Sequence, residues 1–99
     1  EFIDVESVTK NEYPMALKLK SWFEPNNFNV KLQFVGDPNR YNVLAFPKGT
    51  DPKSAKILIN SHIDVVPPYF GPAKIKDNKI YGRGACDTKS IIAAQLCAV

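Results

Sequence analysis

The sequence predicts an α/β fold, on the basis of three patterns. Segments with helical periodicity lie near the two ends of the 99-residue chain, at 9–25 and 87–99. Between them, residues 28–35 alternate apolar and polar side chains, as half-buried strands do, and residues 42–46 predict a second strand. A further segment, 56–60, is apolar on consecutive residues, which is typical of a strand covered on both faces of a sheet.

The first helix is predicted from its cap and from one apolar stripe. Asn11 is a favourable N-cap and keeps Pro14 within the first turn, where proline is tolerated. Thr9 with Glu12 offers a competing capping box, and Pro25 ends the helical pattern. The apolar positions recur at the spacing of a helix face buried in a core, and they are Met15, Leu19, Trp22 and Phe23.

The carboxyl-terminal third of the sequence predicts a hairpin and a second helix. Residues 74–82, "KIKDNKIYG", suit a small hairpin in which Asp77 and Asn78 form a two-residue turn. The strong helix formers that follow predict a helix that begins near Asp87 or Thr88.

No repeat, linker or low-complexity tract divides the chain, so residues 1–99 are predicted to belong to one domain. The last helix is still apolar at Val99, and no glycine, asparagine or basic residue closes it. We therefore expect the chain to be one piece of a larger domain.

The composition excludes several classes of function. The net charge of +3 comes from lysines spread along the chain, without the basic cluster that follows a nucleic-acid backbone. No apolar run approaches the length of a membrane span. The two cysteines, Cys86 and Cys97, form no CxxC motif, so we expect two buried or idle thiols and weigh a bridge between them as the alternative. The sequence predicts no particular cellular compartment.

The chemistry-bearing residues begin with "NSHIDVVPP". His62, the only histidine, stands two residues before Asp64, just after the apolar run. Ligands of open α/β sheets gather beyond the carboxyl ends of central strands, and neutral imidazole is a common metal ligand. A carboxylate that accepts the other ring N–H fixes the tautomer and raises the ligand's basicity. The alternative is a hydrogen-bonded histidine with a structural role.

A second carboxylate follows in "YGRGACDTKS". Asp87 lies at the start of the second helix, where a plain N-cap is the ordinary role; a carboxylate there can also join two metal ions. Gly82 and Gly84 allow a close approach of the backbone. Arg83 either pairs with a carboxylate or is solvated, and Lys89 is expected to be exposed.

Together, "SHIDVVPP" and "IYGRGACDTKS" resemble the zinc aminoacylase, carboxypeptidase and acetylornithine deacetylase family of metallopeptidases. The resemblance covers nearly the whole chain, and "ESVTKNEYP" is similar to fungal carboxypeptidase-like members. It implies that residues 1–99 are the amino-terminal part of a catalytic domain. That domain is expected to be a three-layer α/β/α structure with a mixed, mostly parallel sheet.

The resemblance also implies roles for individual residues. His62 matches a zinc ligand, Asp64 matches the active-site carboxylate that supports it, and Asp87 matches the carboxylate that bridges two zinc ions. The Asp87–Thr88 peptide bond is expected to be cis. The implied reaction is metal-dependent hydrolysis of an amide bond in a peptide or an N-acyl amino acid. Cobalt or manganese would also suit such ligands.

Other implications concern what this chain lacks. The glutamate that acts as general base and the remaining ligands are expected beyond residue 99, so the piece alone is expected to bind metal poorly and to be inactive. A homodimer through a further domain is consistent with the resemblance. Ser90 replaces a glycine that is usual in the family.

Two rival functions are weighed against the hydrolase. A non-catalytic relative of the same fold would lack a ligand or the base. A phosphate loop is the more remote rival, because Arg83 and Thr88 stand where that motif requires glycine.

Overall fold

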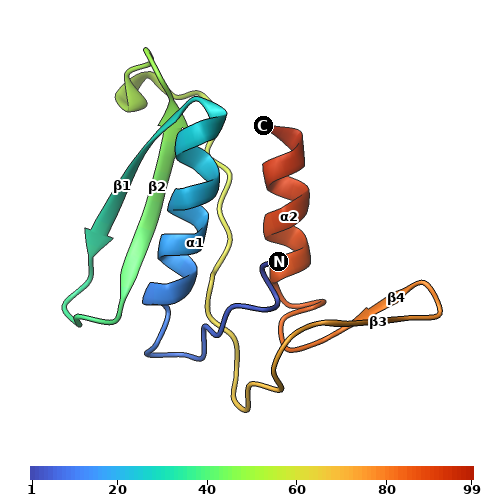
Figure 1. The fold of residues 1–99 in the computed structure, drawn as a ribbon. Helices are drawn as coiled ribbons and strands as arrows, with labels where there is room; N and C mark the ends of the chain where they lie inside the picture. The colour runs from blue at the N-terminus through green and yellow to red at the C-terminus, as the bar shows by residue number, and fades with distance from the viewer.

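The computed structural model describes residues 1–99 and consists of two α-helices, two 3₁₀ turns and two antiparallel hairpins (Figure 1). In chain order the elements are α1 (Tyr13–Phe23), η1 (Glu24–Asn26), β1 (Phe28–Phe34), β2 (Tyr41–Pro47), η2 (Pro52–Ser54), β3 (Lys74–Lys76), β4 (Lys79–Tyr81) and α2 (Lys89–Ala98). The mixed α/β character predicted from the sequence is confirmed.

The strands predicted at 28–35 and 42–46 form the first hairpin. β1 and β2 pair antiparallel along their whole length, from Phe28 opposite Pro47 to Phe34 opposite Tyr41. The rings of Tyr13 and Tyr41 lie 5.1 Å apart and connect the start of α1 to this hairpin. Figure 1 shows α1 lying along the face of the hairpin.

The apolar stripe of α1 forms the core, as predicted. Met15 and Leu19 are buried and form one cluster with Ile92 and Leu96 of α2. Trp22 and other half-buried side chains surround this cluster. Packing between the two helices therefore connects the amino-terminal and carboxyl-terminal parts of the chain.

The predicted cap of α1 is wrong. Glu12 occupies the N-cap position, and no side chain caps the helix. The Glu12 carboxylate is buried and accepts hydrogen bonds from the Lys10 backbone N–H (3.0 Å) and from Arg40 Nε (3.2 Å). The alternative capping box does not form either, because the Thr9 hydroxyl binds Asp64 instead. Pro14 does fall within the first turn.

The strand predicted at 56–60 is absent. This segment runs alongside α2, where the Gln95 side chain donates to the Asn60 carbonyl (3.1 Å), but it pairs with no strand. Ile57 and Leu58 are 80% and 88% exposed. The run has the composition of a covered strand, but no part of residues 1–99 supplies the neighbouring ladder or a second layer. The mostly parallel, three-layer sheet therefore stays a prediction.

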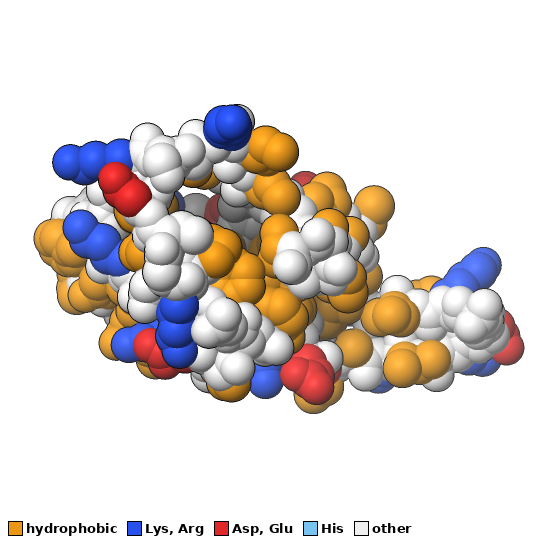
Figure 2. All heavy atoms as spheres, turned by 90° about the horizontal axis from the view of Figure 1, so that it is seen from above, with side chains coloured by type: hydrophobic (Ala, Val, Ile, Leu, Met, Phe, Trp, Pro, Cys, Tyr) orange, Lys and Arg blue, Asp and Glu red, His pale blue; other side chains and the backbone are white.

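The second hairpin is confirmed, with its turn. β3 and β4 pair antiparallel around Asp77 and Asn78, whose φ angles of 49° and 57° are those of a type I′ turn. Figure 2 shows this hairpin projecting from the rest of the molecule with apolar side chains on its surface; Ile75 and Ile80 are among those exposed. No helix is long and apolar enough to cross a membrane.

Candidate metal centre

The loop that carries His62 is held by the amino-terminal segment. Val8 and Val65 form a parallel β-bridge. The Val65 N–H donates to the Ser7 carbonyl (2.9 Å), and the Thr9 N–H donates to the Val65 carbonyl (3.1 Å). Because Val65 is also buried, the backbone next to Asp64 has a fixed position.

The loop that carries Asp87 packs against this same point. Gly84 has a φ of +82°, and a Cβ placed on it would lie only 2.8 Å from Val65 Cγ1. The Lys89 N–H donates to the Gly84 carbonyl (2.9 Å), which closes the loop onto the start of α2. The predicted close approach of the backbone is therefore confirmed at Gly84, and its partner is the loop of His62.

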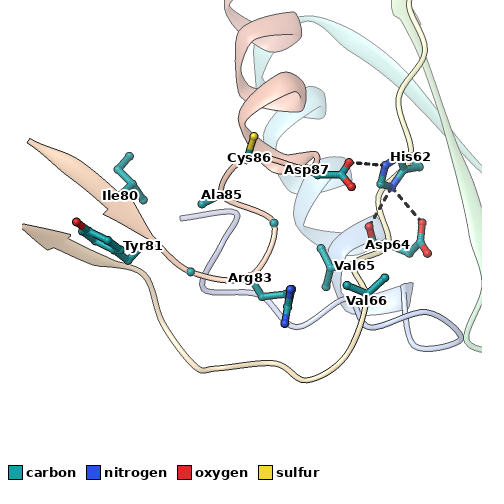
Figure 3. A pocket seen from close by; sticks show the side chains of 12 residues that line it. His62, Asp64, Val65, Val66, Ile80, Tyr81, Arg83, Ala85, Cys86 and Asp87 are labelled. Carbon is teal, nitrogen blue, oxygen red and sulfur yellow. Dashed lines mark hydrogen bonds and ion pairs between the residues drawn. The ribbon is translucent and has the colours of Figure 1, made fainter.

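The imidazole of His62 lies between the two predicted carboxylates (Figure 3). Its Nε2 is 3.0 Å from Asp87 Oδ1. Its Nδ1 is 3.0 Å from the Asp64 backbone carbonyl and 3.2 Å from Asp64 Oδ1. The structure thus brings together all three residues that the sequence singled out, across a separation of 25 residues between His62 and Asp87.

Both ring nitrogens of His62 face oxygen acceptors, so the neutral ring can donate its single proton on only one side. A proton on Nδ1 would be donated to Asp64 and would leave the Nε2 lone pair directed at the Asp87 side. A cation placed there would receive one nitrogen and one oxygen.

Without a cation, the same contacts favour the protonated ring. Partial burial lowers the pKa of His62. The hydrogen bonds to the Asp87 side chain and the Asp64 backbone, and the negative charges of both aspartates, outweigh that effect and raise the pKa above its usual value.

Asp87 does not act as a helix cap. Thr88 holds the N-cap position of α2, without a side-chain cap hydrogen bond. The Asp87 side chain is 83% exposed, and its Oδ1 contacts His62. The Asp87–Thr88 peptide bond is cis, as the resemblance implied.

Two neighbouring residues differ from expectation. Lys89 is buried, not exposed, and its Nζ donates to the Val5 carbonyl (2.5 Å). Arg83 pairs with no carboxylate; its Nε donates to the Pro68 carbonyl (3.0 Å), and its guanidinium lies over the Phe70 ring. Cys86 and Cys97 are free and exposed thiols.

The pair His62 and Asp87 fits one metal ion. With zinc bonds of about 2.0–2.2 Å in tetrahedral geometry, two ligand atoms lie about 3.4 Å apart. The Nε2–Oδ1 distance of 3.0 Å would have to open by only about 0.4 Å. No group of three or more His, Cys, Asp or Glu side chains is arranged to hold a metal ion; His62 and Asp87 would be the two donors of such a site.

A hollow of about 410 Å³ adjoins the pair and is lined by residues of both loops and of β4. His62, Asp64 and Asp87 form part of its wall, together with apolar side chains such as Val66 and Ile80. Figure 3 shows Arg83 on the Val66 side of this hollow. A small molecule in the hollow would lie next to the imidazole and the Asp87 carboxylate.

Sequence reasoning missed one contact of this site. The Thr9 hydroxyl donates to Asp64 Oδ2 over 2.7 Å, across 55 residues. The sequence carried no signal for it, because threonine before a helix is typical of a cap.

Comparison with known proteins identifies the family of this chain. Residues 58–99, which include both loops, match the model of peptidase family M20/M25/M40. The chain belongs to this family. The metallopeptidase resemblance inferred from "SHIDVVPP" and "IYGRGACDTKS" is therefore confirmed.

Fungal relatives agree along the whole chain. A probable carboxypeptidase of Aspergillus niger is 36% identical over 100% of this chain and 27% of its own length. A peptidase M20 domain-containing protein of Schizosaccharomyces pombe is 40% identical over 98% of this chain and 24% of its own length. A probable carboxypeptidase of Emericella nidulans is 39% identical over 99% of this chain and 24% of its own length. No solved structure gives a significant match.

This chain of the M20/M25/M40 family thus spans about a quarter of the length of these relatives. Its fungal carboxypeptidase-like character, predicted from "ESVTKNEYP" and "SHIDVVPP", is supported by their names.

Proposed function

We propose that this chain supplies part of a two-zinc site that hydrolyses an amide bond in a peptide or an N-acyl amino acid. Peptidases of family M20 are generally metal-dependent, and similar proteins are named probable carboxypeptidases. The observation that carries the proposal is the approach of His62 Nε2 to Asp87 Oδ1. An unprotonated imidazole nitrogen and an exposed carboxylate oxygen form the start of a zinc ligand set.

Each of the three residues has a distinct role in this proposal. His62 would hold one ion through Nε2. Asp64 would keep the proton on Nδ1 and the ring in one orientation, as carboxylates behind metal-bound histidines do. Asp87 has two carboxylate oxygens and is exposed, so it could hold one ion with each oxygen.

When bound, zinc ions supply Lewis acidity, which polarises the scissile carbonyl and lowers the pKa of water. A catalytic zinc normally has three protein ligands, and these residues supply two. The glutamate base and the remaining ligands are therefore proposed to lie outside residues 1–99, and this piece alone is proposed to be inactive. The hollow beside His62 would admit the substrate.

The position of Lys89 argues against the phosphate-loop alternative. In such a loop the lysine reaches the phosphates of the nucleotide. Here the Lys89 ammonium is buried and donates to the Val5 carbonyl, so it does not face the hollow that contains His62 and Asp87.

The decisive test uses the whole protein and measures zinc by elemental analysis together with amide hydrolysis. We expect His62→Ala and Asp87→Ala each to lose zinc and to lower hydrolysis by at least about tenfold. Glu24→Gln is the matched control, because the Glu24 side chain forms an exposed ion pair with Lys20 at 3.7 Å and lies outside the site. Full zinc content and normal turnover in His62→Ala would refute the ligand assignment. A wild-type protein that holds zinc but hydrolyses no amide would support the non-catalytic relative.

A further inference from the structure

The Asp64 carboxylate is held at both of its oxygens. Oδ1 lies 3.2 Å from His62 Nδ1, and Oδ2 accepts the Thr9 hydroxyl over 2.7 Å. The terminal torsion of an aspartate side chain is broad and roughly two-fold, so its rotamer alone does not fix the two oxygens. A hydrogen bond at Oδ2 removes that freedom.

Thr9 is well placed to impose this orientation. Its backbone N–H donates to the Val65 carbonyl (3.1 Å), so the residue that follows Asp64 is bound to Thr9 directly. The side chain is β-branched and therefore stiff about χ1. The distance of 2.7 Å is typical of a charge-assisted bond between a hydroxyl and a carboxylate.

The alternative partner of the Thr9 hydroxyl is weaker. The Val65 carbonyl lies 3.4 Å from Oγ1, and it already accepts the Thr9 N–H. The single hydroxyl proton is therefore directed at Asp64. The Asp64 side chain is 33% exposed, so without this bond its carboxylate could turn toward water and away from Nδ1.

We propose that Thr9 is a positioning residue of the metal centre: its hydroxyl orients Asp64 so that His62 keeps its proton on Nδ1 and presents Nε2 to the cation. This inference rests on the proposed function for its metal. The segment before α1 thereby takes part in the site although it contributes no ligand.

The test compares Thr9→Val with Thr9→Ser in the whole protein after removal of its metal. Valine keeps the shape and the β-branch, and serine keeps the hydroxyl. Zinc affinity is measured by competition with a chromophoric chelator. Loss of a group that orients a ligand typically costs 10–100-fold in metal affinity, and Thr9 acts through Asp64, so we expect a loss of about tenfold for Thr9→Val. Thr9→Ser should stay within about threefold of wild type, because the hydroxyl is retained.

A matched control separates this effect from general damage. Thr50 also donates its hydroxyl, to the Pro47 carbonyl (2.6 Å), but it lies in the turn after β2. Thr50→Val should keep the zinc affinity of wild type, and thermal unfolding verifies that every variant is folded. If the zinc affinity of Thr9→Val stays within about twofold of the wild-type affinity, the Thr9 hydroxyl does not act on the metal centre and the inference is overturned.

A second readout does not depend on zinc. Nitrogen-15 NMR of the imidazole in the metal-free protein, above the pKa of His62, reports which ring nitrogen carries the proton. We expect the Nδ1–H form to dominate in wild type and Thr9→Ser, and to decrease in Thr9→Val. If the fraction of the imidazole that carries its proton on Nδ1 is the same in Thr9→Val as in wild type, the inference is overturned. A wild-type protein that binds no zinc refutes only the proposed function, because the NMR comparison still tests Thr9.

Discussion

Gly84 is where the two loops of the metal centre touch, and its replacement by alanine tests that contact. Its φ is +82°, a conformation that costs L-residues other than glycine about 1–2 kcal/mol. The new Cβ would lie 2.8 Å from Val65 Cγ1 and 3.1 Å from Lys89 Cδ. Neither neighbour can move easily, since Val65 is buried in the bridge to Val8 and the Lys89 ammonium is bound to Val5.

The magnitude follows from two separate terms. Overpacking of a filled site typically costs about 1–3 kcal/mol. Added to the backbone term, this predicts a loss of about 2–5 kcal/mol in the free energy of unfolding for Gly84→Ala. Gly49 supplies the control, because its φ is +80° but nothing lies within 4 Å of the added Cβ. Gly49→Ala should therefore lose only about 1–2 kcal/mol.

The assay is urea unfolding of both variants, together with zinc content in the whole protein. The difference between the two losses isolates the crowding at Val65, and we expect it to be about 1–3 kcal/mol. We also expect Gly84→Ala to lose zinc, because a displaced loop carries Asp87 away from His62. Equal losses of stability in the two variants, with zinc retained, would show that the loops do not meet at Gly84 as described.

Two predictions concern titration of the metal-free protein. The pKa of His62 should lie above 6.5, and an NMR titration that places it below 6.5 would contradict the two aspartate contacts. Because the native chain holds this proton more tightly than the unfolded chain, the stabilisation is complete below the unfolded-state pKa and is lost as pH rises through the native value. Burial lowers the pKa of Lys89 below 10.5, and attraction to Asp4 offsets only part of this effect. The unfolded chain then holds the lysine proton more tightly than the native chain, so the free energy of unfolding should increase as pH rises from the native pKa toward 10.5. An NMR titration of the Lys89 side chain that gives an unshifted pKa would contradict its burial.

Local patterns predicted most of the secondary structure. The stripe of Met15 and Leu19 identified the buried face of α1, because helical periodicity is a property of neighbouring residues. The alternation in 28–35 identified β1 for the same reason. The dipeptide Asp77–Asn78 identified the β3–β4 turn, since it tolerates the positive φ angles required.

Predictions that depended on distant partners were less successful. The segment 56–60 has the composition of a covered strand, but a strand requires a neighbouring ladder, and none lies beside it. The predicted Asn11 cap of α1 is wrong: Glu12 holds the N-cap position, and Arg40, 28 residues away, binds its carboxylate. Lys89 was expected to be exposed, yet the Val5 carbonyl, 84 residues away, accepts its proton inside the fold.

The sequence by itself determined which residue types could do chemistry here: one histidine, one aspartate two positions later, and one aspartate after a glycine-flanked turn. It also determined the family, because the order and spacing of these residues can be read directly from the sequence. Only the tertiary structure decided that His62 Nε2 faces Asp87 and that Thr9 holds Asp64. Contacts of 3.0 and 2.7 Å between segments 25 and 55 residues apart depend on how the loops pack around Val65 and Gly84, and local sequence carries no record of that packing.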